Sequence, residues 1–61
     1  MEFYLSNVVI TIIKTNDLTD GRFLYHYIVW NKCGQMIDNG DIEANSYEDT
    51  KNYLKHIWEE R

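Results

Sequence analysis

Three side chains of this sequence could support nucleophilic chemistry: the thiol of Cys33 and the imidazoles of His26 and His56. A thiol acts as a nucleophile when a base lies within hydrogen-bond reach and a third group orients that base in a pocket that excludes water. The sequence predicts Cys33 in a turn, His26 in the middle of a strand and His56 late in a helix. These residues also lack the C-x-x-C and H-x-x-x-H spacings of structural zinc sites. We therefore expect neither an enzyme nor a zinc site.

Carboxylates and turn residues occur together in segments 17–21 and 38–41, where their oxygens could bind calcium. Neither segment matches the D-x-[DN]-x-[DN]-G loop with its terminal Glu. The sequence also contains no Gly-rich phosphate loop. It therefore predicts no metal and no cofactor.

The stretch between Lys32 and Lys51 contains no basic residue. Its acidic residues are Asp38, Asp41, Glu43, Glu48 and Asp49. One interpretation is structural, because charge on an edge strand discourages aggregation and acids suit the start of a helix. The other is functional: a negative patch that imitates nucleic-acid phosphates or docks onto a basic protein.

Length and composition predict one small acidic domain that spans residues 1–61. A chain of this size buries only about 60% of the surface that its unfolded form exposes, so it usually needs a disulfide, a metal, a partner or a rich core. With one cysteine no intrachain disulfide forms, and 15% aromatic residues can supply the core. The net charge of −4 disfavours binding to nucleic acid by general electrostatics. The single thiol and the lack of a signal peptide lead us to expect a cytoplasmic protein without a membrane span.

The elements that must position these residues are three strands and one helix. Residues 3–14, 22–31 and 35–43 read as strands, with a break at Ser6 and Asn7 and a bulge at Gly40. Gly34 occupies the left-handed position of a tight turn. Ser46 is a good N-cap, and apolar residues then recur every three or four positions up to Trp58. We expect an α+β fold: a three-stranded antiparallel meander, order 1-2-3, with the C-terminal helix packed on one face.

The second predicted strand is apolar on both of its faces. Leu24, Ile28 and Trp30 alternate with Tyr25 and Tyr27. Strands that are apolar on both sides are usually covered on both sides, whereas one helix covers only one. We expect Leu24, Ile28 and Trp30 to face the helix, because tyrosines tolerate water better. The tyrosine face then either stabilises the sheet through cross-strand pairs or meets another molecule, such as a second copy of the chain.

Residues 22–58 resemble the arm-type DNA-binding domains of phage and transposon integrases. The resemblance lies in Tyr27-x-x-Trp30-x-x-x-Gly34, followed by Gly40 and by Ser46-x-x-Asp49. It implies a three-stranded sheet that enters the major groove with basic and polar side chains. The sequence departs from that pattern, because its sheet offers only Lys14, Arg22, His26 and Lys32 as cations and carries aromatic residues on the face expected to be exposed.

These observations favour a non-catalytic module that binds a protein partner, either a basic nucleic-acid-binding protein or a second copy. The partner-binding residues that we predict are Tyr25, Tyr27, Asp38, Asp41 and Glu43. Small acidic proteins of this type are common among phage-encoded inhibitors of host machinery, including inhibitors of CRISPR effectors. The alternative is a nucleic-acid-binding domain of the integrase arm-binding type, which would stack bases on Tyr25, Tyr27 and Trp30.

Overall fold

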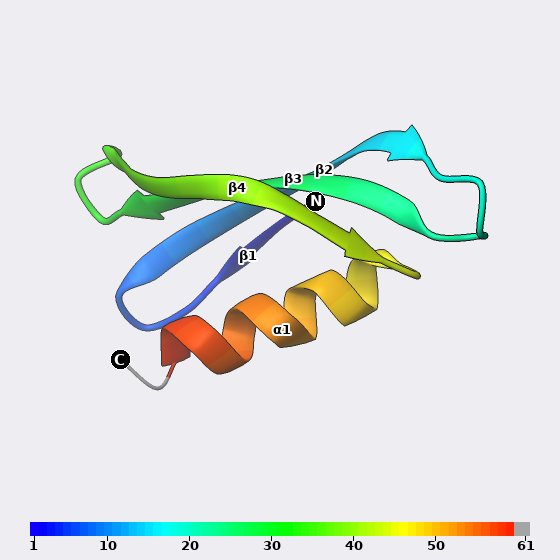
Figure 1. Ribbon diagram of the computed structural model, residues 1–61. Coiled ribbons are helices and arrows are strands. Elements are labelled where there is room, and N and C mark those ends of the chain that lie inside the picture. Colours follow the sequence, from blue (N-terminus) through cyan, green and yellow to red (C-terminus); the bar gives the residue numbers. More distant parts are fainter. Residues whose placement is uncertain (60–61) are drawn as a thin grey trace.

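Four antiparallel strands form one layer of the molecule and a single helix forms the second layer (Figure 1). The computed structural model describes residues 1–59. Its elements are β1 (Glu2–Tyr4), β2 (Val8–Asp17), β3 (Phe23–Asn31), β4 (Met36–Ala44) and α1 (Tyr47–Glu59). The sheet is a meander of order β1-β2-β3-β4, so β1 and β4 are its edges. The α+β class, the antiparallel meander and the C-terminal helix are confirmed, whereas the predicted count of three strands is wrong.

The extra strand arises because segment 3–14 folds back on itself at Ser6 and Asn7. The Leu5 N–H donates to the Val8 carbonyl at 2.9 Å and closes the turn. The terminal ammonium of Met1 donates to the Ile12 carbonyl at 2.8 Å, and the Ile12 N–H donates to the Met1 carbonyl at 2.7 Å. These bonds extend the pairing of the three-residue β1. The predicted break is therefore a reversal of the chain, which small polar residues permit.

The core lies between the sheet and α1. Its buried side chains come from β1, β2, β3 and α1: Phe3, Val8, Ile10, Ile12, Tyr25, Val29, Thr50 and Leu54. The predicted helical stripe faces the sheet, since Thr50 and Leu54 are fully buried and Trp58 packs against the cluster. The helix covers one face of the sheet and leaves the other without a second layer (Figure 1).

The helix begins as the sequence predicts. The Ser46 hydroxyl accepts a hydrogen bond from the Asp49 N–H at 3.1 Å, which satisfies one of the free donors of the first turn. The Thr50 hydroxyl donates to the Ser46 carbonyl at 3.1 Å, so this buried polar group is also satisfied. The expected length of about fifteen residues reaches positions 60 and 61, which lie outside the described residues. Within residues 1–59, no helix is long and apolar enough to cross a membrane.

The prediction of which strand face meets the helix is wrong. Tyr25 is only 2% exposed, and its ring centroid lies 4.9 Å from that of Tyr47 at the start of α1. Tyr27 packs beside it, partly buried, against the core. Leu24, Ile28 and Trp30 therefore point away from the helix. The ring of a tyrosine buries as much area as that of a phenylalanine, and its hydroxyl needs only to reach the rim of the layer.

Gly40 does not form the predicted bulge. The irregularity in β4 lies at Ile37, because Val29 pairs with Asp38 whereas Trp30 pairs with Met36. Gly40 pairs directly with Tyr27, and a Cβ at Gly40 would lie 2.8 Å from the Tyr27 hydroxyl oxygen. The glycine thus makes room for the ring of Tyr27. At Gly34 the prediction is confirmed, since its φ is +83° in the β3–β4 turn.

Candidate interaction surface

The side of the sheet that faces away from α1 is the candidate site, and we call it the open face. The strand register assigns to it Glu2 and Tyr4 of β1, Val9, Thr11 and Ile13 of β2, Leu24, His26, Ile28 and Trp30 of β3, and Met36, Asn39, Asp41 and Glu43 of β4. Tyr4 is 71% exposed, Ile13 47% and Met36 55%. The apolar side chains of the two central strands are only half-buried, although no helix covers them. The open face is therefore apolar along its centre.

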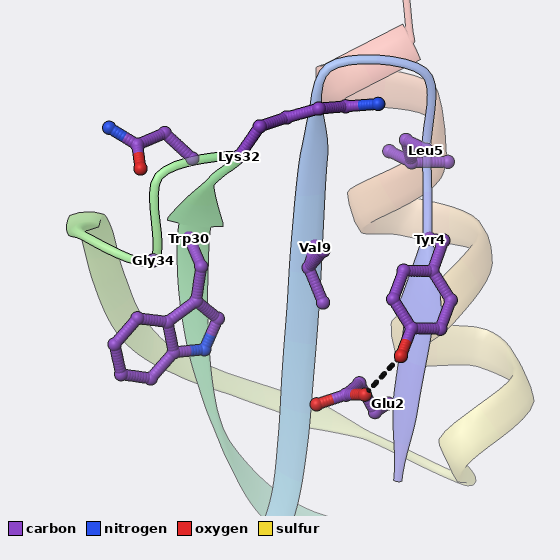
Figure 2. Close-up of a pocket in the computed structure, with 8 residues that line it drawn as sticks. Glu2, Tyr4, Leu5, Val9, Trp30, Lys32 and Gly34 are labelled. Atoms are coloured by element: carbon purple, nitrogen blue, oxygen red, sulfur yellow. Dashed lines mark hydrogen bonds between the residues drawn. The ribbon is translucent and has the colours of Figure 1, made fainter.

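A hollow of about 500 Å³ lies at one end of the open face. Tyr4 pairs with Val9, and Val9 pairs with Trp30, so the three side chains form one row across three strands. Figure 2 looks onto this row, with α1 behind the sheet, and shows the two aromatic rings face-on on either side of the smaller Val9. The short side chain between two large ones forms the floor of the hollow.

Hydrogen bonds hold both aromatic rings of the hollow in place. The indole N–H of Trp30 donates to Thr11 Oγ1 at 3.1 Å. The Tyr4 hydroxyl donates to Glu2 Oε1 at 2.7 Å, and this bond, followed by the charge of Glu2, raises the pKa of Tyr4 above its usual value (Figure 2). The bond of Trp30 is partly buried and restrains the indole, whereas the bond between Tyr4 and Glu2 is exposed to water.

Opposite charges stand at the two ends of the hollow. Glu2 lies level with Thr11 in the register, two residues from Val9. Lys32 follows Asn31, which pairs with Val8, so it lies beyond Val9 in the other direction. Its side chain extends from the end of β3 across β2 towards Leu5 (Figure 2). Among residues 1–59, neither Glu2 nor Lys32 forms an ion pair.

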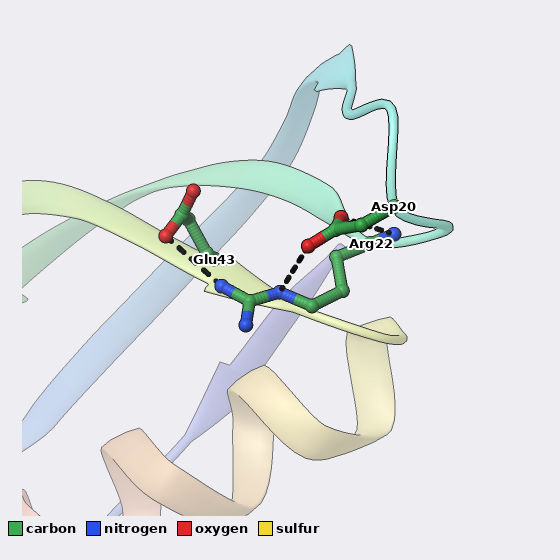
Figure 3. Close-up of polar contacts among 3 residues, drawn as sticks. All are labelled: Asp20, Arg22 and Glu43. Carbon is green, nitrogen blue, oxygen red and sulfur yellow. Dashed lines mark hydrogen bonds and ion pairs between the residues drawn. The ribbon is translucent and has the colours of Figure 1, made fainter.

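At the other end of the open face the polar side chains already have partners. His26 Nδ1 lies 3.0 Å from an Asp41 carboxylate oxygen. The Arg22 guanidinium donates to Glu43 at 2.9 Å and lies 3.9 Å from Asp20, so it joins the β2–β3 loop to β4 (Figure 3). A second hollow of about 530 Å³ lies beside this cluster, between β4 and Tyr53 of α1. Here the carboxylates of Asp41 and Glu43 already have side-chain partners.

The predicted acidic patch is therefore divided. Asp41 and Glu43 lie on the open face, beside His26 and Arg22 respectively, whereas Asp38 pairs with Val29 and so belongs to the helix side. The two predicted tyrosines are also on the helix side, where burial, followed by the charge of Asp38, raises the pKa of Tyr27. The structure does not bring the five predicted residues together into one surface.

The sequence interpretation missed Glu2, Tyr4, Val9 and Lys32. The signal was present in the alternation of Val9, Thr11 and Ile13, which contrasts with the buried Val8, Ile10 and Ile12. Only the pairing of β1 with β2, however, shows that Tyr4 lies beside Val9.

The residues considered for catalysis do not form a site with a base and an orienting group. Cys33 is exposed in the β3–β4 turn. His26 lies five residues before the end of β3, which places it about 17 Å from the start of that turn along the extended strand. His56 belongs to α1, on the opposite side of the sheet. Within the described part of the chain, no group of three or more His, Cys, Asp or Glu side chains is placed to hold a metal ion.

Comparison of the chain with protein families, with curated proteins and with solved structures gives no match. The function must therefore be argued from the open face itself.

Proposed function

We propose that this chain is a non-catalytic protein-binding module that acts through the open face of its sheet. One observation carries the proposal: a four-stranded sheet has a helix on one side only, while its other side bears a continuous row of apolar and aromatic residues. An antiparallel sheet that faces water usually alternates between apolar and polar positions. An exposed apolar patch with polar neighbours is typical of a surface that binds another protein.

The chemistry of the patch suits a protein partner. Interfaces are enriched in Trp, Tyr and Met and depleted of unpaired charge at their centre. The open face has Trp30 and Tyr4 around Val9, with Met36 next to Trp30 in the register. The indole of Trp30 is restrained by its partly buried hydrogen bond to Thr11, so it loses little side-chain entropy on binding.

Sheet-based binding of nucleic acid has less support. Tyr25 is buried and Tyr27 faces the helix, so two of the three aromatic residues proposed for base stacking are not on the open face. Arg22 and His26 are engaged with Glu43 and Asp41. Binding of a phosphate backbone requires several free cations on one face.

The inhibitor hypothesis remains a proposal of the same class. The outer edge strand β4 carries Asp38, Asp41 and Glu43 and no basic residue. A basic surface of a partner could meet this strand while apolar contacts form on the open face. Because Asp41 and Glu43 already have side-chain partners in His26 and Arg22, we assign the main binding contribution to the apolar row.

Photocrosslinking tests the proposal with a matched control. A benzoyl-phenylalanine at Tyr4 would stand on the open face, and the same residue at Tyr53, which is 55% exposed on α1, would stand on the other side of the molecule. We expect protein adducts from position 4, identified by mass spectrometry after irradiation in an extract of the native host, and few or none from position 53. Adducts only from position 53, or adducts from position 4 that nuclease removes, would contradict the proposal.

A further inference from the structure

We infer that the partner segment on the open face is an amphipathic α-helix of another protein. The helix lies along β2, over Val9, with an acidic residue at the Lys32 end and a basic residue beside Glu2. This inference rests on the proposed function, because it names the class of partner for the same surface. Three features carry it: a groove of helical width, a sheet end that suits a single element, and two charges of opposite sign that form no ion pair within residues 1–59.

The groove runs along β2 between two aromatic walls. Tyr4 of β1 and Trp30 of β3 are both level with Val9 and lie on the two strands next to it. Their backbones are therefore two strand spacings apart, or about 9.6 Å. Bonds to Glu2 and Thr11 direct the two side chains towards the interior of the sheet, and Figure 2 shows Val9 uncovered between them. An α-helix with its side chains is about 10–12 Å across, so one helix fits this width.

The end of the sheet favours a single helix over a second sheet. β1 has only three residues and ends level with Val9, so a stacked sheet would find few strands to cover here. A helix needs only β2 and its two neighbours. The opposite face shows what this sheet accepts, because α1 packs there through Thr50 and Leu54, which lie four positions apart on one helical face. Apolar residues at that spacing in the partner helix would cover Val9 and, further along β2, Ile13, which is 47% exposed.

The two charges that form no ion pair set the polarity of the partner. Glu2 is level with Thr11, and Lys32 is one residue beyond Asn31, which pairs with Val8. The two backbone positions are therefore four residue levels apart along β2, or about 14 Å. A helix rises about 1.5 Å per residue, and long charged side chains shorten the span that it must bridge, so an acid and a base about seven residues apart on one face reach both. Complementary charge beside an apolar contact fixes the register of the partner.

The far end of the open face adds no further charge selectivity. Asp41 lies 3.0 Å from His26 Nδ1, and Glu43 accepts a hydrogen bond from Arg22 at 2.9 Å. These carboxylates would have to leave a partner in their own chain before they could meet another protein. Glu2 and Lys32 are therefore the residues that select the charges of the helix.

Two fluorescent peptides test the inference through the sign of one charge. Both are about 18 residues long and share one leucine ridge, because shorter helices are marginal in water. They carry either Glu and Lys or two Lys residues at positions about seven apart. Each is titrated by fluorescence anisotropy into the Lys32→Glu and Lys55→Glu variants, which have the same net charge and so attract the peptides equally at long range. Lys55 is exposed on α1, away from the groove.

We expect the ratio of the two dissociation constants to differ between the variants. Relative to Lys55→Glu, Lys32→Glu should favour the peptide with two Lys residues by at least about threefold, because both ends of its groove are acidic. The indole N–H of Trp30 and the amide of Val9 should shift in nuclear magnetic resonance spectra when wild type binds the Glu–Lys peptide. Circular dichroism confirms that each variant is folded.

Three results would overturn the inference. They are no binding of either peptide by wild type at about 1 mM, equal ratios in the two variants, and shifts confined to the exposed side of α1 around Tyr53. The photocrosslinking experiment separates this inference from the proposed function. Adducts from position 4 that map to a second copy, or to a partner segment without helical apolar spacing, would refute the helix and leave the binding module standing. The absence of any protein adduct from position 4 would refute both.

Discussion

Tyr27 lies so close to Gly40 that the effect of Gly40→Ala on stability should depend on the tyrosine ring. The substitution should destabilise the fold when the ring is present and stabilise it when the ring is removed. In wild type, a Cβ at position 40 would lie 2.8 Å from the Tyr27 hydroxyl oxygen and 3.0 Å from two ring carbons. Carbon and oxygen atoms do not approach so closely without displacement, so Gly40→Ala must move the ring or the strand. Overpacking of this kind costs about 1–3 kcal/mol.

The backbone of Gly40 does not oppose the substitution, because its φ is not among the positive values found at Gly21 and Gly34. A Gly→Ala change at a compatible position stabilises a protein by about 0.4–1 kcal/mol, since it restricts the unfolded chain. With Tyr27 in place we therefore expect Gly40→Ala to destabilise the fold by about 1–2 kcal/mol. In a Tyr27→Val background, which removes the ring and keeps a strand-forming residue, the same change should stabilise the fold by about 0.4–1 kcal/mol.

Urea denaturation of the four proteins, followed by circular dichroism at one fixed concentration, completes a double-mutant cycle. The coupling energy should be about 1.5 kcal/mol or more, because the sum of the two effects defines it. If Gly40→Ala changes the free energy of unfolding equally in the wild-type and the Tyr27→Val backgrounds, the ring does not decide the choice of glycine and the reasoning is refuted.

Two further predictions concern the helix layer. Leu54→Ala removes a side chain that is 1% exposed and should lower the free energy of unfolding by about 2–5 kcal/mol. That loss is enough to unfold most of a domain whose total stability is about 3–5 kcal/mol. A thermal transition like that of wild type would show that α1 does not pack through Leu54. Burial raises the pKa of the Tyr27 hydroxyl above 10.0 in the folded protein. As the pH rises past about 10, Tyr27 therefore loses its proton first in the unfolded chain. The contribution of the Tyr27 hydroxyl to the free energy of unfolding is then lost between about pH 10 and the higher folded pKa. Denaturation at pH 8 to 11 should therefore show the advantage of wild type over Tyr27→Phe shrinking with pH, and a constant difference would contradict it.

Local chemistry was readable in the sequence wherever neighbours in the chain decide the structure. Ser46 begins the helix through a hydrogen bond to the N–H three residues later, and Gly34 occupies a turn that other residues enter only at a cost. The spacing of Thr50 and Leu54 placed one helical face in the core. These features depend on contacts within a few residues, so their residue types alone were informative.

The candidate site was less predictable because it depends on pairing between distant segments. The break at Ser6 and Asn7 was visible, but a bend, a bulge and a reversal share the same residue types. Only the pairing of β1 with β2 brings Tyr4 next to Val9 and Glu2 level with Thr11. The acidic residues of β4 likewise appeared as one patch, until the register placed Asp41 beside His26, Glu43 beside Arg22 and Asp38 on the opposite side of the sheet.

The sequence by itself determined the acidic composition, the antiparallel sheet, the C-terminal helix and the presence of two apolar sheet faces. The tertiary structure alone decided which of those faces the helix covers. Side chains of a strand alternate between faces, so the pattern defines two sets of residues, and both sets here are apolar. The choice between them follows from how α1 returns to the sheet, with Tyr47 against Tyr25. That docking buries Tyr25, places Tyr27 on the helix side and leaves Trp30, Ile28 and Leu24 on the open face.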